Sequence, residues 1–275
     1  MTPPNVPQAA PPVRADRAGP AVYAGPPLVA VAHGSRDPRA ARVVGELMEL
    51  VRARRPGLDV QAAFLDHMAP SPARALEGLA GAGVREAVVL PLLLTAAYHS
   101  KIDLPGVLRR VRAGHPGLDV RYGGTLGPHA ALLTVLARRL TEVGVTAPDP
   151  ETAVVLTSAG SSDSAANATI AGLAARWSAA ARRDGRGWHS VVPAYASAAA
   201  PDPATAIASR HAAGARRVVV APYFLSPGHF ADQVAASATD AGAFATAPVL
   251  GPSETLAEIV LQRYDATHPA IPAAA

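Results

Sequence analysis

Two histidines and one aspartate follow the first three apolar runs of the chain. His33 comes directly after the first run, Asp66 lies at the end of the second, and His99 lies in the loop after the third. The runs span residues 28–32, 58–65 and 86–94. Open parallel sheets bind ligands outside the carboxyl ends of their strands, and neighbouring strands lie about 4.8 Å apart. If the runs are neighbouring strands in the common order 2-1-3-4, the three side chains converge on one rim.

These residue types suit the joint handling of a metal ion and of protons. Two neutral imidazoles and a carboxylate are a reasonable ligand set for iron, cobalt, nickel or zinc, and imidazole accepts a proton near neutral pH. Inserting a divalent metal into a macrocycle needs both properties, because the two pyrrole N–H protons leave as the metal arrives. We predict that His33 and His99 bind the metal and are catalytic, with Asp66 as a third catalytic residue.

Each of the three residues also has a purely structural interpretation. His33 could hydrogen-bond backbone groups in a strand-to-helix turn, and His99 could be an incidental residue of an exposed loop. Asp66 could cap the helix that begins near residue 71. Their shared position at three adjacent strand ends favours the functional interpretation.

Polar residues beside the two histidines suggest recognition of an acidic substrate. Gly34-Ser35 precede a helix whose free backbone N–H groups attract anions. The chain has neither a Gly-x-Gly-x-x-Gly phrase nor a Walker phrase, which argues against a nucleotide site. We assign Ser35, Arg36 and Lys101 to the carboxylates of the substrate; ordinary surface charge is the alternative for Arg36 and Lys101.

Helical patterns alternate with the apolar runs. Asp37 is predicted to cap the first helix, with Pro38 in its first turn. Later helices are predicted over residues 71–82, 104–113 and 128–143. Alternating strands and helices predict an α/β fold, a doubly wound unit with a parallel sheet.

The same order of phrases returns in the second half of the chain. With small changes in length, residues 158–163, 195–203, 218–225 and 250–252 repeat the phrases at 32–37, 64–72, 88–94 and 126–128. These ordered matches predict two tandem duplicated α/β domains. We expect an N-terminal domain over residues 28–145 that carries the active site and a C-terminal domain over 153–265.

The C-terminal copy lacks most of the chemistry. Ala159 stands at the position of His33, and Ser197 stands at the position of Asp66. Only His229 persists, as the counterpart of His99. A single imidazole is a poor metal site, so the active site of this copy is predicted to be degenerate, and His229 is either a residue that reaches the substrate or a relic of the duplication.

Composition excludes several other classes of protein. The 275 residues contain no cysteine, which rules out disulfides, thiolate metal sites and cysteine nucleophiles. The net charge of +4 is scattered, without the basic stripe typical of nucleic-acid binding. No apolar run approaches the roughly 20 residues of a membrane span. Residues 1–27 are rich in Pro and Ala and lack a secretory signal, so we predict a disordered tail on a cytoplasmic protein.

The site phrases resemble those of the sirohydrochlorin chelatases, the class II chelatases of siroheme and cobalamin biosynthesis. The resemblance rests on residues 28–37, on 64–72 and on 90–105, and it extends over about residues 28–264. The family usually has Glu where this chain has Asp66. The resemblance implies two similar α/β domains facing a cleft, with His33 and His99 as metal-binding histidines. It also implies that a divalent metal, iron or cobalt and less readily nickel, is inserted into a carboxylate-rich tetrapyrrole without an organic cofactor.

Other functions stay open at this stage. A non-catalytic tetrapyrrole or metal carrier could be built on the same domains, and so could a flavodoxin-like nucleotide or flavin module. A Ser–His–Asp hydrolase is disfavoured, because neither Ser35 nor Ser161 lies in a Gly-x-Ser-x-Gly elbow. The sequence does not specify an oligomeric state.

Overall fold

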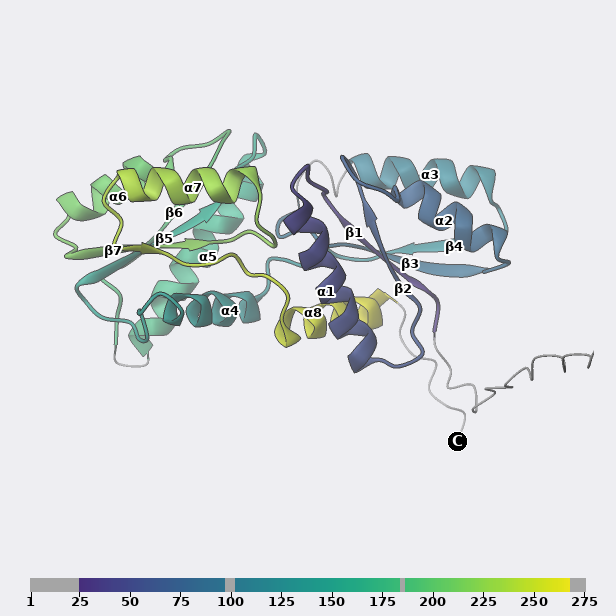
Figure 1. Ribbon diagram of the computed structural model, residues 1–275, viewed down its shortest axis with the longest axis horizontal. Helices are drawn as coiled ribbons and strands as arrows, with labels where there is room; N and C mark the ends of the chain where they lie inside the picture. Colours follow the sequence, from purple (N-terminus) through teal and green to yellow (C-terminus); the bar gives the residue numbers. More distant parts are fainter. Residues whose placement is uncertain (1–24, 97–101, 184–185, 268–275) are drawn as a thin grey trace, which may run out of the picture.

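The computed structural model describes residues 25–96, 102–183 and 186–267 (Figure 1). In the first half, strands alternate with helices in the predicted manner. The elements are β1 (Leu28–Ala32), α1 (Pro38–Arg54), β2 (Val60–Phe64), α2 (Pro72–Gly81), β3 (Glu86–Pro91), α3 (Leu104–Gly114), β4 (Asp119–Tyr122) and α4 (Ala130–Thr141).

The second half repeats this order. Its elements are β5 (Thr152–Ser158), α5 (Ser164–Arg183), β6 (Ser190–Tyr195), α6 (Pro203–Ala212), β7 (Arg217–Pro222), α7 (His229–Asp240), β8 (Ala245–Thr246) and α8 (Glu254–Thr267). The sheets run β2-β1-β3-β4 and β6-β5-β7-β8, with every pairing parallel. The predicted strand order and the duplicated α/β fold are therefore confirmed.

Capping interactions explain where helix α1 begins. The Asp37 side chain accepts a hydrogen bond from the Arg39 N–H, and Pro38 occupies the first turn of α1. The apolar face of α1 is buried against the sheet through residues that include Val44, Leu47 and Val51. The central strand β1 is buried along its whole length, as expected for an inner strand with helices on both faces.

The final helices of the two halves are exchanged. Helix α8, from the second half, packs against α1 and β3, whereas α4, from the first half, packs against β7 (Figure 1). Ion pairs join α1 to α8, from Arg54 to Glu254 and from Arg55 to Asp265. Each sheet is thus covered in part by a helix from the other half, and the division at residues 145 and 153 stays a prediction.

One apolar core runs through both halves. It contains Leu47 of α1 and Ile259 of α8, and it continues to Trp177 of α5. The opposite face of each sheet has a separate core, under α2 and α3 in the first half and under α6 and α7 in the second. The shared core binds the two sheets into one packed structure.

The start of the described chain also packs against α8. Pro26 is buried, and its carbonyl accepts a hydrogen bond of 2.8 Å from the Tyr264 hydroxyl. Pro26, which was assigned to the predicted tail, is therefore packed against the protein, whereas residues 1–24 lie outside the described residues. Among the helices described, none combines the length and apolar composition needed to cross a bilayer.

Candidate functional site

His33 and Asp66 are neighbours at the carboxyl edge of the first sheet. The register pairs Ala32 with Phe64, and the ladder continues beyond both strands. Leu65 N–H donates to the Ala32 carbonyl at 3.0 Å, and Asp66 N–H donates to the His33 carbonyl at 2.9 Å. Both residues are exposed, so their side chains are accessible to a ligand at this edge.

Gly34 permits this close approach of the two backbones. Its φ is +92°, and a Cβ added to it would lie 1.9 Å from the Asp66 carbonyl oxygen. No other residue fits such a position without moving the Asp66 backbone. The glycine therefore sets the separation of the two predicted catalytic residues.

His67, which was not among the predicted site residues, contacts the carboxylate of Asp66. Its N–H donates to Asp66 Oδ1 at 2.8 Å, and its ring Nε2 lies 3.4 Å from Asp66 Oδ2. The signal in the sequence was its position directly after Asp66, but only the backbone conformation, with φ at 62°, brings the ring back to that carboxylate.

The predicted convergence of the two histidines remains a prediction. His33 lies where the sequence analysis placed it, with Nδ1 at 3.2 Å from the Gly34 carbonyl oxygen. His99 and Lys101 lie outside the described residues. Within the described ranges, which therefore lack His99, no group of three or more His, Asp or Glu side chains is arranged to hold a metal ion.

Ser35 and Arg36 occupy the turn between His33 and α1. The Ser35 Oγ accepts a hydrogen bond of 3.0 Å from the Asp37 N–H, so the hydroxyl helps to start the helix and still has a proton to donate. Arg36 is exposed, and no hydrogen bond or ion pair engages its guanidinium within the described part of the chain. Arg36 is thus available to an anionic ligand.

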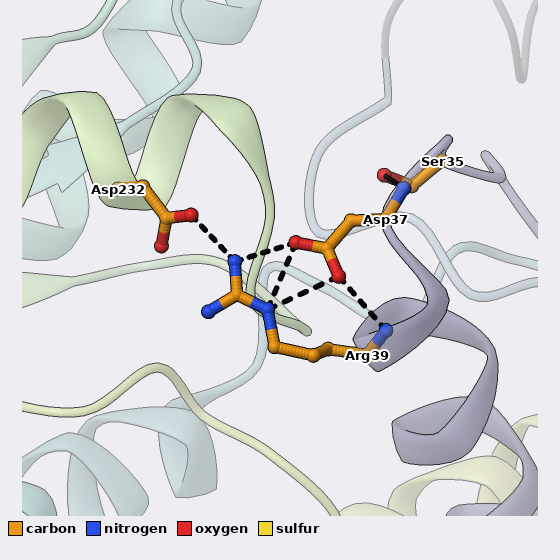
Figure 2. Close-up of polar contacts among 4 residues, drawn as sticks. All are labelled: Ser35, Asp37, Arg39 and Asp232. Atoms are coloured by element: carbon orange, nitrogen blue, oxygen red, sulfur yellow. Dashed lines mark hydrogen bonds and ion pairs between the residues drawn. The ribbon is translucent and has the colours of Figure 1, made fainter.

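A cluster of one arginine and two aspartates joins the two halves beside this turn (Figure 2). Arg39 binds Asp37 through Nε and Nη2, and the same Nη2 reaches Asp232 in the first turn of α7. The Arg39 side chain and its backbone N–H hold the pKa of Asp37 below its usual value. Hydrogen bonds to Asp37 and Asp232 raise the pKa of Arg39 further above its already basic value. The sequence analysis missed this cluster, since nothing local connects Arg39 to Asp232.

The second half keeps the scaffold of the site without its side chains. Ser197 N–H donates to the Ala159 carbonyl at 2.9 Å, as Asp66 does to His33. Gly160 has a φ of +82°, and a Cβ there would lie 1.9 Å from the Ser197 carbonyl oxygen. Ala159 and Ser197 offer neither an imidazole nor a carboxylate. His229, the first residue of α7, is exposed, and its ring centroid lies 5.5 Å from that of Phe230.

Comparisons with known proteins agree with this architecture. The family model described as CbiX matches residues 27–143 and again 153–267, so it recognises both copies. The sirohydrochlorin cobaltochelatase of Priestia megaterium is 28% identical over 205 residues, which are 72% of this chain and 63% of the relative. The sirohydrochlorin ferrochelatase of the same organism is 27% identical over 238 residues, which are 84% of this chain and 86% of the relative.

A solved structure shows the same fold. The structure described as SirB from Bacillus subtilis with Fe3+ superposes with a TM-score of 0.75 at 22% identity, covering 88% of this chain and 95% of that one. The family model matches each half of the chain separately, as expected for a duplicated domain. This chain therefore belongs to the CbiX family of sirohydrochlorin chelatases.

Proposed function

We propose that this chain inserts a divalent metal ion, iron or cobalt, into sirohydrochlorin or a closely related carboxylate-rich tetrapyrrole. The observation that carries the proposal is the hydrogen bond that sets Asp66 beside His33 at an accessible sheet edge. Relatives named as ferrochelatase and as cobaltochelatase support both metals as substrates. An enzyme that catalyses this reaction is classed as a lyase. We further propose that the protein acts in the cytoplasm and uses no organic cofactor.

The proposed mechanism divides metal and proton handling among three side chains. His33 and His99 hold the incoming metal ion and accept the two pyrrole N–H protons in turn. Asp66 orients an imidazole or takes a proton onward. One divalent ion enters and two protons leave, so the charge of the macrocycle is unchanged.

Substrate recognition is assigned to positively charged and hydroxyl side chains near the carboxyl edge of the first sheet. Arg36, Lys101 and the Ser35 hydroxyl are proposed to meet the peripheral carboxylates of the tetrapyrrole. Arg36 suits this role because its guanidinium is exposed. The second half is proposed to shape the pocket, since its scaffold is retained at Gly160 and Ser197 although its ligands are not.

The test is anaerobic incubation of the purified chain with sirohydrochlorin and Fe2+, Co2+ or Ni2+, followed by absorption spectra. We expect metallated product in molar excess over protein; one equivalent or less would indicate a carrier. The preferred metal would then favour siroheme or cobalamin biosynthesis.

The variant His33→Ala, alone and combined with His99→Ala, should lose insertion while the circular dichroism spectrum is retained. The control is His115→Ala, because His115 follows the last residue of α3, at the opposite edge of the sheet. Insertion that persists in the double variant would exclude the proposed site.

A further inference from the structure

The contacts of His67 give it a relationship to the site that the proposed mechanism does not use. The Asp66 side chain is 62% exposed, so an unrestrained carboxylate would rotate in solvent. The His67 backbone N–H donates to Oδ1 at 2.8 Å, and the His67 ring Nε2 lies 3.4 Å from Oδ2. Together these two contacts favour one orientation of the carboxylate.

The backbone at this position does not depend on the imidazole. The counterpart of His67 in the second half is Ala198, and both have positive φ, 62° and 56°. The turn therefore adopts the left-handed conformation in both halves, whether or not the side chain is large. Glycine is favoured at such an angle, because the backbone of a residue with a Cβ is strained there. The fold therefore does not require a histidine at this position, since alanine occupies the equivalent position of the second half.

Comparison of the two halves distinguishes residues that shape the backbone of the site from residues that carry its titratable groups. Scaffold residues of the site are the same in both halves, as Gly34, Ser35 and Asp37 match Gly160, Ser161 and Asp163. The imidazoles and the carboxylate of residues 33, 66 and 67 are absent from the second half, where the corresponding residues are Ala159, Ser197 and Ala198. The imidazole at residue 67 is present only in the half that keeps the carboxylate beside it.

We propose that His67 is a positioning residue that fixes the orientation of the Asp66 carboxylate beside His33. The proposal rests on the proposed function and deepens it. His67 acts through Asp66 and does not touch the substrate. Each carboxylate oxygen has a second lone pair, so the contacts with His67 leave Asp66 able to accept a further hydrogen bond or a proton.

The test compares His67→Gly with Ala198→Gly, since both place glycine at a left-handed position. Both substitutions should leave thermal stability unchanged or raised. Only His67→Gly should lower kcat for metal insertion, by roughly 10- to 100-fold, as is usual for loss of a group that orients a site residue. The KM for sirohydrochlorin should stay the same. His67→Asn should recover part of the kcat, because Asn tolerates the left-handed region and its amide can donate to a carboxylate.

A second readout separates this proposal from the function on which it rests. Coupling constants measured by NMR should show one dominant χ1 rotamer of Asp66 in the wild type. The population of that rotamer should fall in His67→Gly, which keeps the backbone N–H but loses the ring. An unchanged rotamer, or a wild-type kcat in His67→Gly, would overturn the role of His67. If the wild type inserts no metal, the proposed function fails, and the rotamer comparison alone decides the role of His67.

Discussion

Arg39 and Asp232 are joined across the two halves, although 193 positions separate them in the chain. The pair connects the first turn of α1 to the first turn of α7, next to the turn that follows His33 (Figure 2). Their side chains are 43% and 57% exposed, so solvent screens their attraction. The pair therefore aligns the halves at the site more than it stabilises them.

A double-mutant cycle with Arg39→Ala and Asp232→Ala tests this interpretation. We expect a coupling free energy of about 0.2–1 kcal/mol from urea denaturation at low salt. The coupling should shrink in 1 M NaCl, where the screening length is about 3 Å. Coupling well above that range and insensitive to salt would mean that the pair is desolvated and contributes to stability.

Substitution of Gly34 should disturb both stability and the site. The Cβ in Gly34→Ala would meet the Asp66 carbonyl, and Gly160→Ala creates the same clash with Ser197. Both variants should lose at least about 1–3 kcal/mol of unfolding free energy, measured in urea. Gly34→Ala should lose far more insertion activity than Gly160→Ala at a temperature where both variants remain folded. Equal activity losses would indicate that the second half contributes directly to the chemistry.

The shared core predicts that the two halves unfold together. Both tryptophans, Trp177 and Trp188, lie in the second half, so their fluorescence reports on that half. Leu47→Ala in α1 should remove about 2–5 kcal/mol of stability. Because α8 packs against α1 and α4 packs against β7, the tryptophan transition should move to lower urea concentration.

Ile207→Ala, in the separate core of the second half, is the matched variant and should shift the same transition. A fluorescence midpoint that responds to Ile207→Ala but not to Leu47→Ala would show that the halves unfold independently.

Asp149 should make stability depend on pH in the acid range. Partial burial raises the pKa of Asp149, but hydrogen bonds from the Thr152 hydroxyl, the Glu151 N–H and Arg217 outweigh this effect and hold that pKa below its usual value. Its stabilisation is therefore present above the unfolded-state pKa of about 3.9 and is lost as pH falls through the lower folded-state value.

Asp149→Asn should be less stable than the wild type at pH 7, and the difference should narrow by pH 3. Urea midpoints measured across this range give the comparison. Parallel curves for the two proteins would contradict the assigned role of the charge.

His229 is predicted to be dispensable for insertion. Neither Ala159 nor Ser197 can join it in holding a metal, and one imidazole is a poor metal site. His229→Ala should retain an insertion rate close to that of the wild type under conditions in which His33→Ala is inactive. A large loss in steady-state assays would show that this imidazole reaches the substrate.

Much of the fold was predictable, because each sheet is built from local patterns. Apolar runs bounded by turn residues placed β1 over the predicted residues 28–32, and the helix predicted over 71–82 is α2 at Pro72–Gly81. The duplication extended the strand order from one half to the other. The helix exchange was not predictable, because the periodicity of α8 shows that one face is buried but not which sheet buries it.

Some contacts of the candidate site could also be predicted from the sequence, and others could not. The proximity of His33 and Asp66 follows from the strand order, which was predicted, and from the register of β1 with β2, which only the structure gives. The contact of His67 with Asp66 depends on a left-handed turn that residue types alone do not specify. The bond between Arg39 and Asp232 depends on how two distant helices meet.

The exchange of α4 and α8 has a consequence for how such a chain can evolve. After duplication, deletion of either copy would strip a helix from the wall of the other and leave an apolar sheet face uncovered. The second copy lacks the imidazole and the carboxylate, yet its helix α8 still covers the sheet of the first copy. A change in the second copy can therefore weaken the first copy without touching the predicted site.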